Sequence, residues 1–146
     1  MVASYREKII TLWAVFLLGI LFHTQLGLMP LFHNLSVATS EAHETTDIAW
    51  VLWLMLGFFV IPMGLIITAL FTHSKPYRRL HFGVTVVYSL LNFFHIVADL
   101  LVQPIAWYQI ALMIILFLIG ILLNIVAFQW MHSRETHRLL QEHSVL

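Results

Sequence analysis

The stretch IAWYQIALMIILFLIGILLNIVAFQWM, residues 105–131, decides the class of this fold. It carries no charged side chain, and its amide side chains are confined to Gln109, Asn124 and Gln129. About 20 apolar residues are enough to cross roughly 30 Å of hydrocarbon as a helix. A helix that is apolar on all sides over this length is typical of a membrane span and not of a soluble core.

Three further runs have the same character, at residues 9–32, 48–72 and 82–102. In the whole chain 61% of residues are apolar and 10% are charged, against about 25% charged in soluble domains. We therefore predict an all-α fold, a four-helix transmembrane bundle that forms one domain over residues 1–146. The short connections predict up-down topology, with the lipid bilayer as the first partner.

The basic residues predict the orientation in the membrane. All seven fall before the first run, between the second and third, or after the fourth: Arg6, Lys8, Lys75, Arg78, Arg79, Arg134 and Arg138. Since Lys and Arg mark cytoplasmic connections, both termini and the tail at 132–146 are expected in the cytoplasm. The loop at 33–47 then faces outward. We expect an integral, multi-pass protein of a cell inner membrane.

Composition excludes several kinds of site. Cysteine is absent, so no disulfide, thiolate zinc site or covalent haem attachment is possible. Net charge is zero, which gives no indication of nucleic-acid binding. No phosphate-binding loop, dinucleotide fingerprint or hydrolase motif occurs, so hydrolase and ATPase activity are unsupported. Enzymatic activity of another kind stays open. Nine histidines are available to bind a metal.

A polar stripe runs along the third span. Its members are spaced three or four residues apart and share one helical face of roughly 80°: His81, Thr85, Tyr88, Asn92, His95, Asp99 and Gln103. Hydrogen bonds between helices would explain Thr85, Tyr88, Asn92 and Gln103. His95 and Asp99 are functional candidates, because ionisable groups within a span are costly.

His23 in the first span matches His95 in depth. Each lies about 22–24 Å along its helix from Lys8 or Arg79. Two imidazoles at one depth could ligate a haem b non-covalently, with His23 and His95 as its axial ligands. They could instead bind copper, iron or zinc together with Asp99. A His–Asp pair in a proton path is the third possibility.

The outer loop repeats the same residue types. His43, Glu44 and Asp47 could collect a metal ion, or they could form the exposed acidic start of a helix. His81 and the histidines near the basic residues are expected to be solvated. Asn124 is expected to bond to Tyr88 at similar depth.

Pro62 interrupts the second span, where we expect a kink and a neighbouring helix that satisfies the freed carbonyl. Gly19, Gly27 and Gly120 would permit close contacts between helices.

The preferred function is binding of a haem or transition metal in the outer half of the bilayer, for a redox or metal-handling role. The alternative is an accessory subunit or assembly factor of a larger membrane complex. A proton-coupled transporter is less favoured, because four helices need to oligomerise to form a pathway. A homo-oligomer or a larger complex is expected for each of these functions.

Overall fold

The computed structural model describes residues 3–37, 48–72 and 74–133, and within these ranges every regular element is a helix. The elements in chain order are α1 (Tyr5–Leu28), the short 3₁₀ helix η1 (Met29–His33), α2 (Ala49–Phe71), α3 (Lys75–Leu101) and α4 (Trp107–His132). The predicted all-α fold is confirmed.

The four α-helices of the described ranges are long and apolar enough to cross a membrane. Large apolar side chains cover their outer faces; Leu18 is 65% exposed, Phe71 81% and Leu118 60%. Water would disfavour so much exposed apolar surface, whereas lipid chains accommodate it. The chain is therefore an integral membrane protein in contact with the bilayer.

Two helices begin earlier than the hydrophobic runs indicate. The hydroxyl of Ser4 and the side chain of Glu7 form a capping box that starts α1 at Tyr5. The hydroxyl of Ser74 accepts from the backbone N–H of Tyr77, so α3 starts at Lys75 instead of at residue 82. Capping satisfies backbone N–H groups that the helix leaves unpaired. Helix therefore extends into polar sequence at both places.

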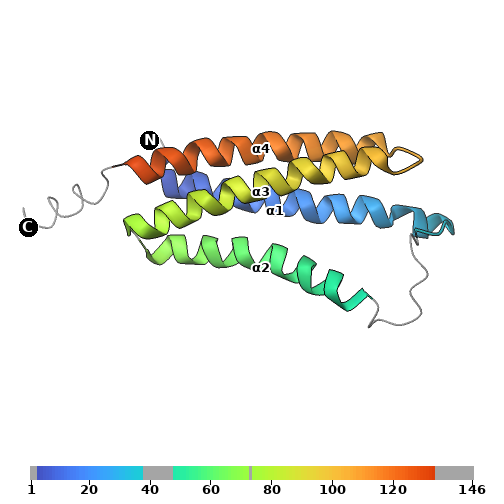
Figure 1. Cartoon of the computed structure of the whole chain (residues 1–146), viewed down its shortest axis with the longest axis horizontal. Helices are drawn as coiled ribbons and strands as arrows, with labels where there is room; N and C mark the ends of the chain where they lie inside the picture. Colours follow the sequence, from blue (N-terminus) through green and yellow to red (C-terminus); the bar gives the residue numbers. More distant parts are fainter. Residues whose placement is uncertain (1–2, 38–47, 73, 134–146) are drawn as a thin grey trace, which may run out of the picture.

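Successive helices run in opposite directions, and α4 packs closely against both α1 and α3 (Figure 1). Glycine allows this approach at two points. A Cβ added at Gly19 of α1 would lie 2.2 Å from Leu116 Cδ2 of α4, and one at Gly120 of α4 would lie 3.0 Å from Ser89 Oγ of α3. The predicted close contacts are thus found at Gly19 and Gly120. At Gly27 an added Cβ would make only an ordinary contact.

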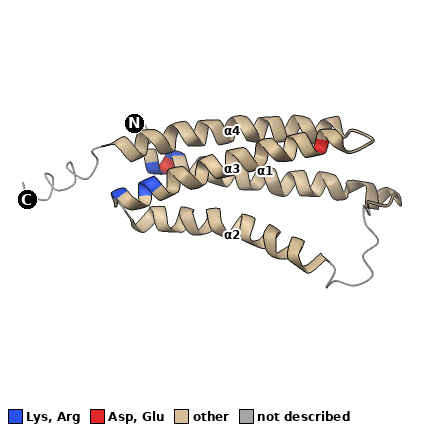
Figure 2. Ribbon diagram, in the orientation of Figure 1, with Lys and Arg blue, Asp and Glu red and all other residues tan. Residues whose placement is uncertain are grey.

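The described Lys and Arg residues gather at one end of the bundle, here called the basic end (Figure 2). Two of them bond to the last carbonyls of neighbouring helices. Arg6 Nη1 donates to Leu70 O near the end of α2, and the buried Arg78 donates to Trp130 O and Ser133 O at the end of α4. A cation at a helix C-terminus also interacts favourably with the helix dipole. These contacts tie the helix ends together.

Helix α2 is attached mainly near the basic end. Pro62 lacks an N–H, which leaves the carbonyl of Phe58 without its helical partner. The Tyr88 hydroxyl of α3 donates to that carbonyl at 2.8 Å, so a neighbouring helix satisfies it as predicted, although Tyr88 was not the residue expected to do so. Toward its N-terminal end α2 separates from α1 and α3 (Figure 1). A cavity lined by side chains of α1, α2 and α3 lies there.

Candidate metal centre

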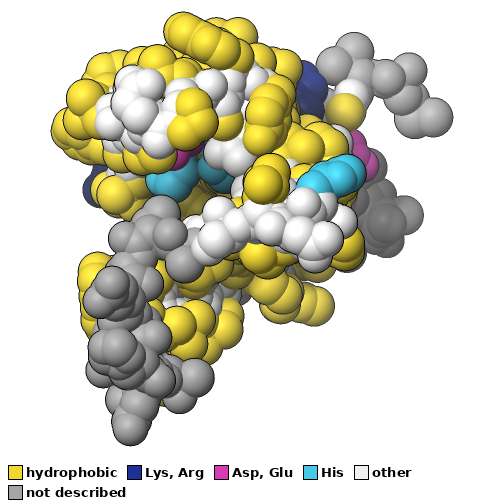
Figure 3. All heavy atoms as spheres, turned by 90° about the vertical axis from the view of Figure 1, so that its right-hand side faces the viewer, with side chains coloured by type: hydrophobic (Ala, Val, Ile, Leu, Met, Phe, Trp, Pro, Cys, Tyr) yellow, Lys and Arg dark blue, Asp and Glu magenta, His cyan; other side chains and the backbone are white. Residues whose placement is uncertain are grey.

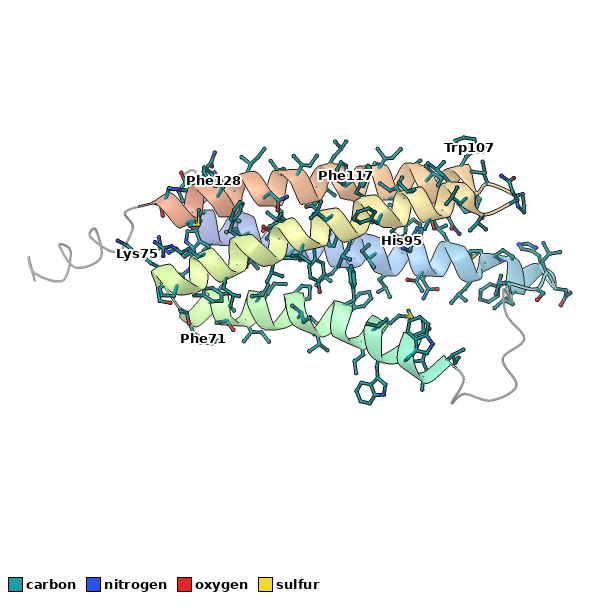
Figure 4. All side chains as sticks on the ribbon, in the orientation of Figure 1. Phe71, Lys75, His95, Trp107, Phe117 and Phe128 are labelled. Carbon is teal, nitrogen blue, oxygen red and sulfur yellow. The ribbon has the colours of Figure 1, made fainter. Side chains whose placement is uncertain are left out.

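Three potential metal ligands meet far from the basic end. His95 and Asp99 are four residues apart on α3, so their side chains share one face, and His23 comes from α1. These residues form the only group of three or more His, Cys, Asp or Glu able to hold a metal within the described ranges. We call His23, His95 and Asp99 the His–Asp cluster. Figure 4 labels His95 on α3 where this helix lies over α1.

The donor atoms of the cluster converge. His23 Nε2 lies 3.4 Å from His95 Nε2. Asp99 Oδ1 lies 3.5 Å from His95 Nε2, and Asp99 Oδ2 lies 3.8 Å from His23 Nε2. The two imidazole rings are 5.3 Å apart between centroids and inclined by 79°. Each residue thus turns a donor atom toward the same small volume.

These separations can be compared with coordination geometry. Metal–nitrogen bonds of about 2.0–2.1 Å at a tetrahedral angle place two nitrogen ligands about 3.4 Å apart. Bonds of this length on opposite sides of one ion place them about 4.1 Å apart. The 3.4 Å between His23 Nε2 and His95 Nε2, which is also a hydrogen-bond contact between the two rings, is close to the tetrahedral value. The rings also contact each other, so no flat macrocycle fits between them in this arrangement.

The charge of Asp99 has no fixed cationic partner. Its ion pairs within the described ranges are with His23 and His95, and its buried Oδ2 accepts no hydrogen bond there. A largely buried carboxylate is costly unless a positive charge compensates it. The cluster lies in the last turns of α1 and α3, where the negative ends of both helix dipoles favour a cation. The local field is therefore suited to a metal ion.

Two cavities adjoin the cluster. The larger has a volume of about 470 Å³ and is lined by both histidines; the smaller, of about 80 Å³, is lined by Asp99 and by residues of the α3–α4 connection. The His95 side chain is 52% exposed, against 14% for His23 and 21% for Asp99. Figure 3 views this end and shows histidine side chains beside an acidic one, between apolar side chains. The cluster thus borders two cavities, and His95 is its most exposed member.

The rest of the polar stripe divides into two parts. His81, Thr85, Tyr88 and Asn92 are buried against neighbouring helices, whereas Gln103 is exposed in the connection after α3. The prediction that His81 is solvated is wrong, because this side chain is fully buried. The reason is the early start of α3, which places His81 within the bundle and not at its edge. His43, Glu44 and Asp47 lie outside the described residues.

Sequence reasoning missed the partners of His81 and the larger cavity. His81 Nε2 accepts from Trp13 Nε1 at 3.0 Å, and His81 Nδ1 lies 3.2 Å from the Tyr77 hydroxyl. The four-residue spacing of Tyr77 and His81 indicated that their side chains contact each other, since residues four apart on a helix are neighbours. The cavity had no comparable signal, because the wall formed by α2 is uniformly apolar.

Comparison of the chain with protein-family models, curated proteins and solved structures finds no match in any of the three.

Proposed function

We propose that this membrane protein binds a transition metal ion through His23, His95 and Asp99, with zinc as the ion that the geometry favours. The observation that supports this most directly is the 3.4 Å separation of the two Nε2 atoms, with a carboxylate oxygen 3.5 Å from one of them. Imidazole and carboxylate together suit zinc, copper and iron. Tetrahedral spacing favours zinc over an octahedral ion, whose adjacent ligands lie closer together.

Three protein ligands leave one tetrahedral position for water or another oxygen ligand. Zinc sites with three protein ligands are typical of catalysis or of ions that are passed on, whereas structural sites have four. This supports a metal-handling role or the activation of a bound water. The two cavities that border the cluster would allow the open position to be reached.

A haem fits this arrangement less well than a single ion does. Axial ligation needs the two imidazoles farther apart, with a flat ring between them, and here the rings are in contact. Binding of a haem b by His23 and His95 would therefore require α1 and α3 to separate. A visible spectrum distinguishes bound haem from a single metal ion.

An accessory subunit that uses the polar stripe to dock against another protein has less support. In the half of α3 nearer the basic end, the stripe bonds within the chain, as in Tyr88 to Phe58 and Trp13 to His81. These groups do not need a partner protein to satisfy them. Homo-oligomerisation, a larger complex and placement in a cell inner membrane stay predictions from the sequence.

The test is metal analysis of the full-length protein purified in detergent, after loading with Zn²⁺ and removal of the excess. We expect about one ion per chain for the wild type. His23→Leu, His95→Leu and Asp99→Asn should each reduce the metal content to background while the protein still inserts. Loading with Co²⁺ should give the intense visible absorption of a tetrahedral site.

His132→Ala is the matched control, because His132 is an exposed histidine at the end of α4, and it should keep full metal content. Full metal content in His95→Leu, or none in the wild type, would contradict the proposal. A Soret band in the wild type that disappears in His23→Leu would show haem binding in its place.

A further inference from the structure

The smaller cavity beside the His–Asp cluster lies at the far end of the bundle, opposite the basic end. Its volume of about 80 Å³ is enough for a few water molecules. Besides Asp99, its walls are residues of the α3–α4 connection and the start of α4: Val102, Pro104, Ala106, Gln109 and Ile110. Val102 is 57% exposed and Pro104 is exposed, so this wall is at the molecular surface. Figure 3 views the molecule from the far end, and histidine side chains with an acidic one beside them are visible there between the helices.

Gln109 brings a polar side chain to the smaller cavity, whose other lining residues apart from Asp99 are apolar. Gln109 Nε2 lies 3.6 Å from the position that a Cβ on Gly27 would occupy. Gly27 is one turn beyond His23 on the same face of α1. Gln109 therefore lies beside α1, about one turn farther from the basic end than His23. Its amide oxygen can replace a water molecule around a cation that moves toward Asp99.

The larger cavity is a poor path for a cation. Its α2 wall consists of apolar side chains, with Phe58 and Phe59 among them. Leu54 of this wall is 63% exposed, on a helix whose outer face contacts lipid. An ion that enters from this direction leaves water for hydrocarbon before it reaches a histidine. Such a transfer is strongly unfavourable, because no polar group replaces the lost hydration.

A layer of packed aromatic rings separates the cluster from the basic end. Trp13 of α1, His81 of α3 and Trp130 of α4 are each 0% exposed. The ring centroids of His81 and Trp130 are 5.6 Å apart, and those of Trp13 and Tyr88 are 5.3 Å apart. Trp13 precedes His23 by ten residues, so this layer lies about 15 Å from the cluster. Rings packed in this way leave no room for a hydrated ion.

We propose that the His–Asp cluster exchanges its cation with one side of the membrane only, through the smaller cavity at the far end. The path ends at Asp99, and Gln109 acts as a positioning residue along it. Because Lys and Arg mark the cytoplasmic side, the far end faces outward, and the source of the ion is the outer aqueous compartment. The identity of the ion rests on the proposed function, whereas the path does not. Access from one side is suited to capturing or delivering an ion, not to conducting it across the bilayer.

The path is tested without bound metal in Asp99→Cys, which introduces a single thiol into a chain without cysteine. The full-length protein is placed in sealed vesicles whose orientation is measured with Ser74→Cys, at the basic end. Ag⁺, an ion-sized thiol reagent, is added on one side, and free thiol is then labelled after unfolding. We expect Ag⁺ to block labelling of Asp99→Cys only from the side opposite Ser74. Adding Ala106→Trp should slow this reaction at least about tenfold. Leu101→Trp, exposed and outside the lining, should not slow it.

The route of the metal itself is tested by its release. The detergent-purified, full-length protein is loaded with Co²⁺, and the loss of visible absorption is followed after addition of EDTA. Gln109→Leu should slow release about tenfold with unchanged cobalt content at saturation. Gln103→Leu removes an exposed amide outside the lining and should have no effect. Met55→Trp, which fills the larger cavity, should also leave the rate unchanged.

Three results would overturn the proposal. They are reaction of Asp99→Cys with Ag⁺ from the Ser74 side, slower release in Met55→Trp with normal release in Gln109→Leu, and an Ag⁺ reaction that Ala106→Trp does not slow. Absence of Co²⁺ from the wild type would contradict the proposed function instead. The Ag⁺ reaction of Asp99→Cys would in that case still decide whether the path exists.

Discussion

His81 shows how burial turns an ionisable residue into a structural one. Trp13 Nε1 can only donate, so His81 Nε2 accepts and carries no proton. The neutral ring then bears its proton on Nδ1, which donates to the Tyr77 oxygen, and the Tyr77 hydroxyl donates to the carbonyl of Leu65 in α2. Both ring nitrogens are used, and three helices are connected through one residue.

His81→Leu should therefore lower stability without affecting the metal. It leaves the buried Trp13 N–H without its acceptor, and we expect a loss of about 1–3 kcal/mol in the free energy of unfolding. The measurement is unfolding of the detergent-purified protein, with metal analysis of the same sample. His132→Ala should change neither quantity. Loss of metal with unchanged stability in His81→Leu would instead assign His81 to the functional site.

At the scale of the helix, α3 changes character along its length. From the basic end to its middle, His81, Tyr88 and Ser89 bond to α1, α2 and α4. Near its C-terminus, His95 and Asp99 border cavities. The predicted bond between Asn124 and Tyr88 is wrong, since Asn124 Nδ2 donates to Ser89 Oγ at 2.9 Å. The Tyr88 hydroxyl is directed to α2 instead, where Pro62 leaves a carbonyl without a partner.

This pairing predicts a measurable coupling between Tyr88 and Pro62. Tyr88→Phe should cost about 0.6 kcal/mol, the average for hydrogen bonds between membrane helices, because the Phe58 carbonyl loses its partner. In a Pro62→Ala background the restored N–H of residue 62 supplies that partner, so the same change should cost less. Unfolding of the wild type, both single variants and the double variant gives the coupling energy. Equal costs of Tyr88→Phe in the two backgrounds would refute the link.

At the scale of the whole molecule, α1, α3 and α4 form a close-packed group, and α2 is attached to it between Phe58 and the basic end. The contacts of α4 with α1 and α3 are tight at Gly19 and Gly120, while α2 is connected through side chains of α1 and α3 that bond to its carbonyls. This difference in attachment creates the larger cavity. His23 and His95 border that cavity.

The orientation of the bundle is tested by accessibility. The chain has no cysteine, so Ser74→Cys before α3 and Ser40→Cys in the outer loop, outside the described residues, each introduce a single thiol. Because Lys and Arg mark the cytoplasmic side, a membrane-impermeant reagent should label the Ser40 variant from outside intact cells and the Ser74 variant only after lysis. Labelling of both from the same side would refute the four-span topology.

The sequence by itself determined the number of spans and the face of α3 that carries the polar groups. Both follow from local regularities, the length that hydrocarbon imposes on a helix and the repeat of 3.6 residues per turn. It also predicted that His23 and His95 lie at one depth, because depth along a straight helix is proportional to residue number. Their Nε2 atoms are 3.4 Å apart.

Only the tertiary structure decided which polar groups are satisfied within the chain. The partners of His81 and Tyr88, the unpaired amide of Asn92 and the apolar wall of Phe58 and Met55 depend on how far α2 separates from α1 and α3. The rotation and separation of helices are set by side-chain packing between segments distant in sequence. Periodicity within one helix carries no information about that packing.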